Sequence, residues 1–353
     1  MSLTILNVAY PLAPAGADTV GGAEQFVAAL DEQITKAGHR SLVIAAGGSS
    51  LRGKLIASPR WEGPLDGPTR KWAAAQHARI LSETLRQFDV DVVHLHGLDF
   101  FEYLPEISVP CIVTLHLPPD WYPPAIFELN RPATVFVCVS EQQRRRCPAL
   151  RIPLRTIPHG VDLSVFFPVS DPGNYAVTLG RICPEKGFHF AIEAAEEAGI
   201  ELIIAGQVYP YAAHERYFHH EVSPRLNSRI RFIGPAGLAE KRKLLSGARC
   251  VLIPSTVAET SSLVAMEALA CGAPVIAFPS GALAEIVEHE KTGLLARNSP
   301  EMARAIRRIG EISREQCRIA ARQRFNLVAE MKSYFGLYAE LARAAGNDRG
   351  KID

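Results

Sequence analysis

Short apolar segments alternate with longer amphipathic segments along most of the chain. The apolar segments are too short for buried helices and are bounded by glycine, proline or charged residues, as buried strands are. We expect strands at residues 3–9, 41–46, 90–95, 111–115, 134–139, 175–180, 201–206, 229–234, 249–254 and 274–278. Helical periodicity lies between them, for example at 21–38, 82–88, 188–199 and 263–272. This alternation predicts an α/β fold of parallel sheets with helices on both faces.

The alternation is interrupted once, by prolines 153, 158, 168 and 172. Prolines at this density end helices and central strands. We therefore expect two doubly wound, Rossmann-like domains, at residues 1–165 and 166–330. Ligands of such sheets bind outside the carboxyl ends of the strands, so a cleft between the two domains is the expected site. A helical stretch from about Ser313 to Ala345 ends the pattern, with a kink expected near Gly336.

Composition narrows the class of protein. The 353 residues are 48% hydrophobic and 21% charged with a net charge of +1, which indicates a globular chain and gives no reason to expect a nucleic-acid partner. No apolar run has the ~20 residues of a membrane span, and the first residues are expected to form a strand, not a signal peptide. Membrane association is possible through Arg144, Arg145 and Arg146, but the charge balance does not support it.

Seven cysteines, an odd number without C-x2-C pairs, indicate reduced thiols of a cytoplasmic protein and no structural zinc. His94, His96 and His116 are candidate metal ligands, since His94 and His96 share one face of a strand. Spacing places no carboxylate or thiol beside them. We therefore expect no metal site and no cofactor.

The segment 258–278, AETSSLVAMEALACGAPVIAF, carries two glutamates, Glu259 and Glu267. Small hydroxyl residues cap a helix that begins near Ser262, and Gly272 ends it. A free helix N-terminus suits a phosphate, and the two carboxylates can accept hydrogen bonds from sugar hydroxyls. The alternative is that both are solvated acids at the end of a helix, where the dipole favours them.

The segment 179–190, LGRICPEKGFHF, places two cations after a strand end. The Arg181 guanidinium and the Lys186 ammonium suit a diphosphate, and fixed cations stabilise the charge that grows on a departing phosphate oxygen. A solvated Arg–Lys loop is the alternative interpretation. The position of Arg181 and Lys186 at a strand end favours the interpretation that they bind a diphosphate.

An ordered set of motifs makes the chain resemble the family 4 glycosyltransferases, which have the GT-B fold. These are GGAE (21–24), DVVHLHG (91–97), VTLH (113–116), VCVS (137–140), IPHGVD (157–162), GRICPEKG (180–187), FIG (232–234), E-x7-E (259–267) and GALAEIVEHEKTGLL (281–295). The resemblance implies a retaining, metal-independent hexosyltransferase. Its donor is a nucleoside-diphosphate sugar, and its acceptor is a small molecule, a glycan or a lipid-linked glycan.

The resemblance also implies roles for particular residues. Arg181 and Lys186 would grip the diphosphate, and Glu259 and His116 would contact the donor sugar. Glu267 would contact the ribose of the donor. The start of the helix at Ser261, Ser262 and Leu263 would bind phosphate. The donor would also be contacted by a loop of the first domain, at Gly21 and Gly22, and near the base by backbone at Gly206, Gln207 and Gly234. The last helix, about 331–350, would cross back to the first domain.

One departure from the family keeps alternatives open. Where family members often have E-G-F-G-L, this chain has Glu259-Thr260-Ser261-Ser262-Leu263. The alternatives are a non-catalytic subunit that binds nucleotide sugars, or an epimerase or phosphorylase on the same fold. Neither the base, the donor sugar nor the acceptor follows from the sequence.

Overall fold

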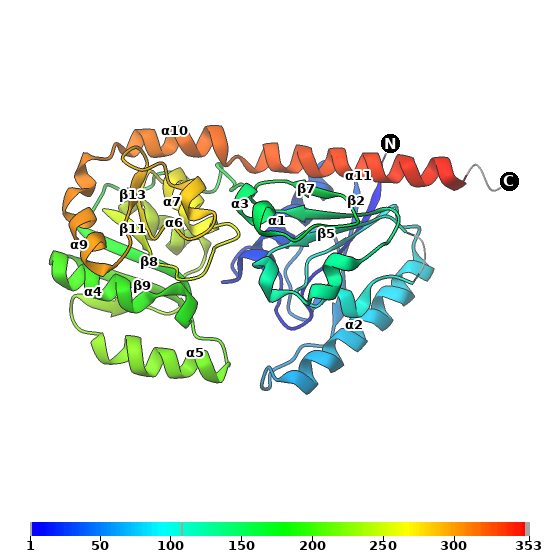
Figure 1. Ribbon diagram of the computed structural model, residues 1–353, viewed down its shortest axis with the longest axis horizontal. Coiled ribbons are helices and arrows are strands. Elements are labelled where there is room, and N and C mark those ends of the chain that lie inside the picture. The colour runs from blue at the N-terminus through cyan, green and yellow to red at the C-terminus, as the bar shows by residue number, and fades with distance from the viewer. Residues whose placement is uncertain (1, 107–108, 350–353) are drawn as a thin grey trace. The chain divides into compact units, whose positions relative to one another are not determined.

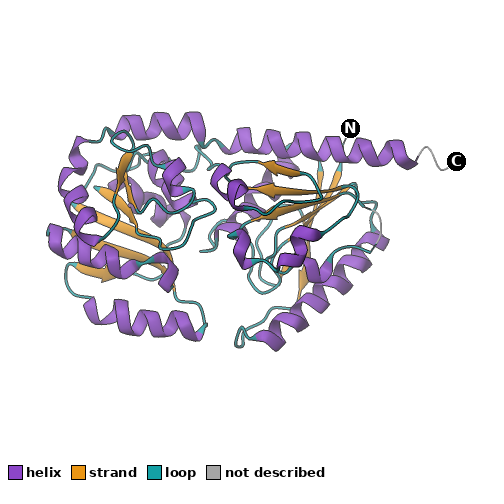
Figure 2. Cartoon of the chain, in the orientation of Figure 1, coloured by secondary structure: helices purple, strands orange, loops and turns teal. Residues whose placement is uncertain are grey.

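The computed structural model describes residues 2–106 and 109–349, which form two compact units (Figure 1). Unit 1 contains the residues up to Ile157 and those from Glu330 onward, and unit 2 contains Pro158–Ala329. Each unit is built around a parallel sheet with helices on both faces (Figure 2). The predicted fold class, two doubly wound parallel α/β sheets, is confirmed.

Unit 1 has a seven-stranded sheet in the order β3-β2-β1-β4-β5-β6-β7, with every pair parallel. Its strands are β1 (Thr4–Val8), β2 (Arg40–Ala46), β3 (Lys54–Ser58), β4 (Val92–Leu95), β5 (Cys111–Leu115), β6 (Thr134–Cys138) and β7 (Leu154–Thr156). Its helices are α1 (Gly22–Lys36), α2 (Gly67–Gln87) and α3 (Glu141–Arg146). The central strands are buried on both faces, which is why they appear in the sequence as continuous apolar runs.

Unit 2 has a six-stranded parallel sheet in the order β10-β9-β8-β11-β12-β13. Its strands are β8 (Tyr175–Arg181), β9 (Glu201–Gln207), β10 (Ile230–Phe232), β11 (Cys250–Ile253), β12 (Val275–Ala277) and β13 (Gly293–Leu295). Its helices are α4 (Phe188–Ala198), α5 (Ala212–Tyr217), α6 (Leu238–Gly247), α7 (Leu263–Ala270), α8 (Leu283–Ile286), α9 (Ser299–Arg308) and α10 (Arg314–Arg324).

Three strands were not predicted: β3, β7 and β13. All three lie at sheet edges, and β7 and β13 have three residues each. An edge strand is buried on fewer sides than a central one, so β3 and β7 lack the continuous apolar run that marked the others.

The helical stretch predicted from about Ser313 to Ala345 consists of two helices. The first, α10, ends before Phe325 and Asn326, and the second, α11 (Leu327–Arg349), continues without interruption through Gly336, where a kink was expected. Asn326 leaves the helix to pair with Val161 in an isolated β-bridge. Its side-chain oxygen accepts a hydrogen bond from the Val328 amide at 2.9 Å and so starts the next helix.

Buried hydrogen bonds attach α11 to the sheet of unit 1. His94 on β4 has its Nδ1 2.8 Å from the Tyr338 hydroxyl and its Nε2 2.7 Å from the Thr114 hydroxyl, which lies 3.1 Å from the Tyr334 hydroxyl. Because both ring nitrogens of His94 are engaged, His94 is a structural residue and offers no metal ligand. Burial holds the pKa of His94 well below its usual range, so the ring is neutral.

None of the helices in the described parts of the chain has both the length and the apolar character of a membrane span.

The buried His77 of α2 should make the stability of unit 1 depend on pH. Its Nε2 lies 3.2 Å from the Ala9 carbonyl oxygen, and burial lowers its pKa to about 4. The unfolded chain takes up this proton near its ordinary pKa of about 6.5, so the native state loses stability as pH falls through the range between the two values. We expect wild type to lose about 1.4 kcal/mol per pH unit relative to His77→Gln across this range.

This expectation can be measured by urea unfolding followed through tryptophan fluorescence at pH 7, 6 and 5. Trp61, Trp72 and Trp121 all belong to unit 1, so the signal reports the unit that contains His77. Parallel stability curves for wild type and His77→Gln would show that the native and unfolded states bind this proton alike.

Candidate functional site

Predicted site residues of unit 2 come together where its parallel strands end. Arg181 is the last residue of β8, paired in register with Gln207, the last residue of β9. The same register pairs Gly180 with Gly206, and the Gly206 amide donates a hydrogen bond to the Gly234 carbonyl oxygen at 2.8 Å. Residues from three neighbouring segments therefore share one edge of the sheet, as the parallel topology predicts.

Glycine is required at position 206 because the backbone of the neighbouring strand β8 lies too close for a side chain. A Cβ atom at this position would overlap the carbonyl oxygen of Gly180 on the neighbouring strand. The absence of side chains at Gly180 and Gly206 leaves backbone as the surface next to Arg181. Such a surface lets a flat ligand approach the strand ends closely.

Lys186 and Glu259, predicted for different parts of a donor, contact each other. Lys186 ends a short 3-10 turn at Pro184–Lys186, and its Nζ lies 2.6 Å from Glu259 Oε1. The Ser255 hydroxyl donates to the same carboxylate oxygen. These contacts hold the ammonium in place, with 26% of the lysine side chain and 10% of the glutamate side chain exposed.

Arg181, at the end of the strand before this loop, is not neutralised by an ion pair within the described chain. It is half-buried, and it forms no ion pair with any residue in the described parts of the chain. Its charge reaches its neighbours electrostatically. Burial lowers the pKa of His214, and the Arg181 charge lowers it further. Burial also raises the pKa of the Cys183 thiol to about 11, although the Arg181 charge acts against that rise.

The helix start predicted near Ser262 is confirmed. Ser262 is the N-cap of α7, and its hydroxyl oxygen accepts a hydrogen bond from the Ala265 amide at 3.4 Å. The preceding Ser261 has a buried hydroxyl oxygen without a hydrogen-bond partner among the described residues. Gly272 follows the helix in the left-handed conformation, with a φ of 77°.

Glu267 lies in the interior of unit 2, not on an open surface. Its Oε1 accepts from Lys241 Nζ at 2.7 Å, and only 3% of the glutamate side chain and 10% of the lysine side chain are exposed. Its Oε2 is buried without a hydrogen-bond partner in the described chain. Lys241 also lies over the Phe166 ring, 5.0 Å from its centroid.

Lys241 is not among the site residues predicted from the sequence, although the sequence contains one signal for it. Lys241 lies three residues after Leu238 and four before Leu245, so it shares the apolar face of α6. A lysine on such a face is a candidate for a buried ion pair, because an isolated buried charge is costly.

In unit 1, His116 follows the carboxyl end of β5. Its Nε2 lies 3.2 Å from Nδ1 of His96, and the other ring nitrogen of His96 lies 3.3 Å from the Asn7 side-chain oxygen. Gly21 is the N-cap of α1, and the Glu24 side chain lies where a Cβ atom of Gly21 would be. The exposed Gly22 follows it.

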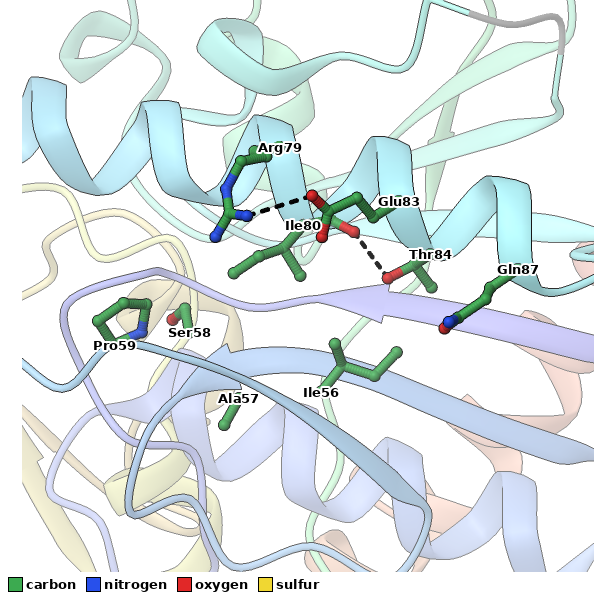
Figure 3. Close-up of a pocket in the computed structure, with 9 residues that line it drawn as sticks. All are labelled: Ile56, Ala57, Ser58, Pro59, Arg79, Ile80, Glu83, Thr84 and Gln87. Carbon is green, nitrogen blue, oxygen red and sulfur yellow. Dashed lines mark hydrogen bonds and ion pairs between the residues drawn. The ribbon is translucent and has the colours of Figure 1, made fainter.

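Unit 1 also has a pocket that the sequence did not predict. A cavity of about 470 Å³ lies between β3 and α2 (Figure 3). It is lined by residues 56–59 and by Arg79, Ile80, Glu83, Thr84 and Gln87, and Arg79 donates to the Glu83 carboxylate at 3.2 Å. None of the predicted site residues lines it.

Curated relatives match parts of the chain. A D-inositol 3-phosphate glycosyltransferase of Corynebacterium efficiens is 36% identical over an alignment of 126 residues that covers 33% of this chain and 29% of that protein. A GDP-mannose-dependent phosphatidylinositol dimannoside mannosyltransferase of Mycobacterium tuberculosis is 29% identical over an alignment of 214 residues that covers 55% of this chain and 53% of that protein. The matched region thus spans about a third to a half of these two relatives' length.

Solved structures match nearly the whole chain in fold. The sucrose-phosphate synthase of Thermosynechococcus elongatus has a TM-score of 0.81 at 22% identity, over 97% of this chain and 100% of that one. Anabaena Alr3699/HepE, solved in complex with UDP and glucose, has a TM-score of 0.72 at 19% identity, over 96% and 99%.

Two family models match the two halves of the chain in the order expected. The model described as Glycosyltransferase Family 4 matches residues 20–165, and the model described as Glycosyl transferases group 1 matches residues 173–311. Their order agrees with the ordered motifs of the sequence and with the two parallel sheets. The chain therefore belongs to the group 1, family 4 glycosyltransferases and has the GT-B fold.

Proposed function

We propose that the protein transfers a sugar from a nucleoside-diphosphate sugar to an acceptor, with retention at the anomeric carbon. The observation that carries the proposal is the grouping of cations at the strand ends of unit 2. Arg181 ends β8 without an ion-pair partner among the described residues, and Lys186 is held by Glu259 in the loop that follows. This arrangement suits a diphosphate, the leaving group of such a donor.

In this reaction the bond between the anomeric carbon and the diphosphate oxygen breaks, and the acceptor oxygen bonds to the same face of the sugar. The acceptor proton passes to the departing phosphate oxygen. Negative charge grows on the diphosphate as the bond breaks. Arg181 and Lys186 stabilise that charge more in the transition state than in the ground state, which is the requirement for catalysis.

Glu259 takes two roles in the proposal. Its Oε1 positions Lys186 and accepts from Ser255. Its Oε2 has no hydrogen-bond partner among the described residues and is available to a donor-sugar hydroxyl. A carboxylate that accepts from a hydroxyl makes a strong, charge-assisted hydrogen bond.

The roles proposed for the remaining donor-binding residues have less support from the observed contacts. The buried Glu267 Oε2 is the acceptor proposed for the nucleotide ribose, and amides at the start of α7 are the proposed phosphate donors. The contributions of Gly21, Gly22 and His116, the backbone contacts near Gly206, Gln207 and Gly234, acceptor binding by unit 1 and a cytoplasmic location stay predictions.

A thermal-shift panel tests the proposal. UDP, GDP, ADP, UDP-glucose and GDP-mannose are suitable ligands, because one structural relative was solved with UDP and glucose and one curated relative is named for GDP-mannose. A ligand at 100 times its dissociation constant adds about 2.7 kcal/mol of stability. We expect one nucleoside diphosphate and its sugar ester to stabilise the protein, and transfer to an acceptor with that ester.

Glu259→Ala separates the sugar contact from the nucleotide contact. The variant should lose more stabilisation by the sugar ester than by the bare nucleotide. Equal losses for both ligands would contradict the assignment of Glu259 to the sugar. A donor that changes without an acceptor would indicate an epimerase, and a need for free phosphate would indicate a phosphorylase.

A further inference from the structure

A second group of reactive side chains lies beside the proposed diphosphate loop. Cys183 precedes the Pro184–Lys186 turn, Glu185 is in that turn, and His214 is in α5, which Figure 1 labels in unit 2. One ligand atom of each residue lies within 4.8 Å of the ligand atoms of the other two. Neither the proposed transfer reaction nor the family match assigns these three residues a role.

The three donors are chemically suited to one kind of ion. A thiolate, an imidazole nitrogen and a carboxylate oxygen are the ligands of Zn²⁺ in proteins, and the thiolate disfavours Mg²⁺ and Ca²⁺. Nδ1 of His214 is buried and has no hydrogen-bond partner in the described chain. A buried ring nitrogen without a partner carries a desolvation cost that a metal ion would remove.

The distances require only a small adjustment. Zinc bonds of about 2.0–2.3 Å in a tetrahedral arrangement place ligand atoms about 3.3–3.6 Å from one another. The Cys183 sulfur and a Glu185 carboxylate oxygen already lie within 4.8 Å of each other. His214 belongs to a different segment, so rotation of its side chain and of Glu185 can close the remaining gap.

We propose that Cys183, Glu185 and His214 bind one thiophilic divalent cation, such as Zn²⁺. The bound ion takes a thiolate, a carboxylate and a neutral imidazole, and the thiol proton is released to solvent. Three protein ligands leave a fourth position for water. The ion would also tie the loop that carries Lys186 to α5, because the ligands come from both segments.

Local charge sets a limit on the affinity. Arg181 lies close enough to His214 and Cys183 to act on both electrostatically, and its positive charge opposes a cation. The thiolate and the Glu185 carboxylate together balance the charge of the ion. We therefore expect the site to bind an ion that bonds strongly to sulfur. Its affinity for ions that bind mainly through charge should be low.

A cobalt titration of the metal-free 353-residue chain tests the proposal without any assay of activity. Co²⁺ replaces Zn²⁺ at such sites and gives a near-ultraviolet absorption band when a thiolate binds it. We expect one Co²⁺ per chain, a thiolate band, and loss of that band when Zn²⁺ is added. Cys183→Ser should remove the band, and His214→Ala should weaken binding at least about tenfold.

Cys147→Ser is the matched control, because Cys147 is a partly exposed thiol of unit 1 whose sulfur lies 3.5 Å from that of Cys138. It should keep the band and the affinity. A band that survives in Cys183→Ser, a band lost in Cys147→Ser, or no saturable binding would overturn the proposal. If the buried Cys183→Ser variant does not fold, wild-type affinity in the folded His214→Ala and Glu185→Gln variants would overturn it equally.

Discussion

Replacing Arg181 with alanine is expected to lower kcat for sugar transfer at least ~100-fold, the loss typical of removing one group that stabilises an oxyanion. The guanidinium is half-buried at the end of β8 and has no ion-pair partner in the described chain, so its charge is available to the diphosphate. The variant should fold normally, because no buried partner is left without its cation. Steady-state kinetics with the donor found in the thermal-shift panel measure the effect.

Lys186→Ala is expected to have an effect of the same size for a partly different reason. It removes the second cation and also leaves Glu259 without the ammonium that lies 2.6 Å from its carboxylate. Donor binding should therefore weaken along with kcat. Arg304→Ala on α9 is the matched control, since Arg304 is an exposed arginine of the same unit and should retain wild-type turnover. Near-normal turnover in both Arg181→Ala and Lys186→Ala would remove the basis for the proposed site.

Lys241→Met is expected to destabilise unit 2 by about 3–5 kcal/mol, the usual cost of removing one partner of a buried ion pair. Glu267 would be left in the interior without the ammonium that Lys241 provides and with Oε2 already unpartnered. Methionine is unbranched and flexible like lysine, so the loss of packing should be small. Hydrogen exchange at the amides of α6 and α7 measures the effect, because all three tryptophans belong to unit 1.

Two further variants distinguish the loss of the buried ion pair from other causes of lower stability in unit 2. Lys291→Met removes an exposed cation that lies 3.4 Å from Glu288, and such a surface change should alter stability by less than about 0.5 kcal/mol. Glu267→Gln in the Lys241→Met background replaces the buried charge with a neutral amide and should recover part of the loss. If the double variant is as unstable as Lys241→Met, the cost does not come from the charge of Glu267.

The central strands and the helix ends could be predicted because their signals are local. A strand buried on both faces is a continuous apolar run, and the cap at Ser262 and the termination at Gly272 lie within a few residues of the helix they bound. The break at Asn326 had one local signal, an asparagine able to cap the helix that follows, which the prediction of a single helical stretch does not use. The break itself depends on a β-bridge to Val161, a residue far away in the sequence, and helical periodicity continues on both sides of it.

The sequence alone thus determined two doubly wound parallel sheets, the family, and the placement of Arg181 and Lys186 at the carboxyl end of the same strand. Only the tertiary structure decided which polar groups meet. Lys186 pairs with Glu259 across 73 residues, Lys241 with Glu267 across 26, and His94 with Tyr338 across 244. The physical reason is that periodicity records which side of an element is buried, whereas a buried polar group must find its partner on whichever element packs against that side.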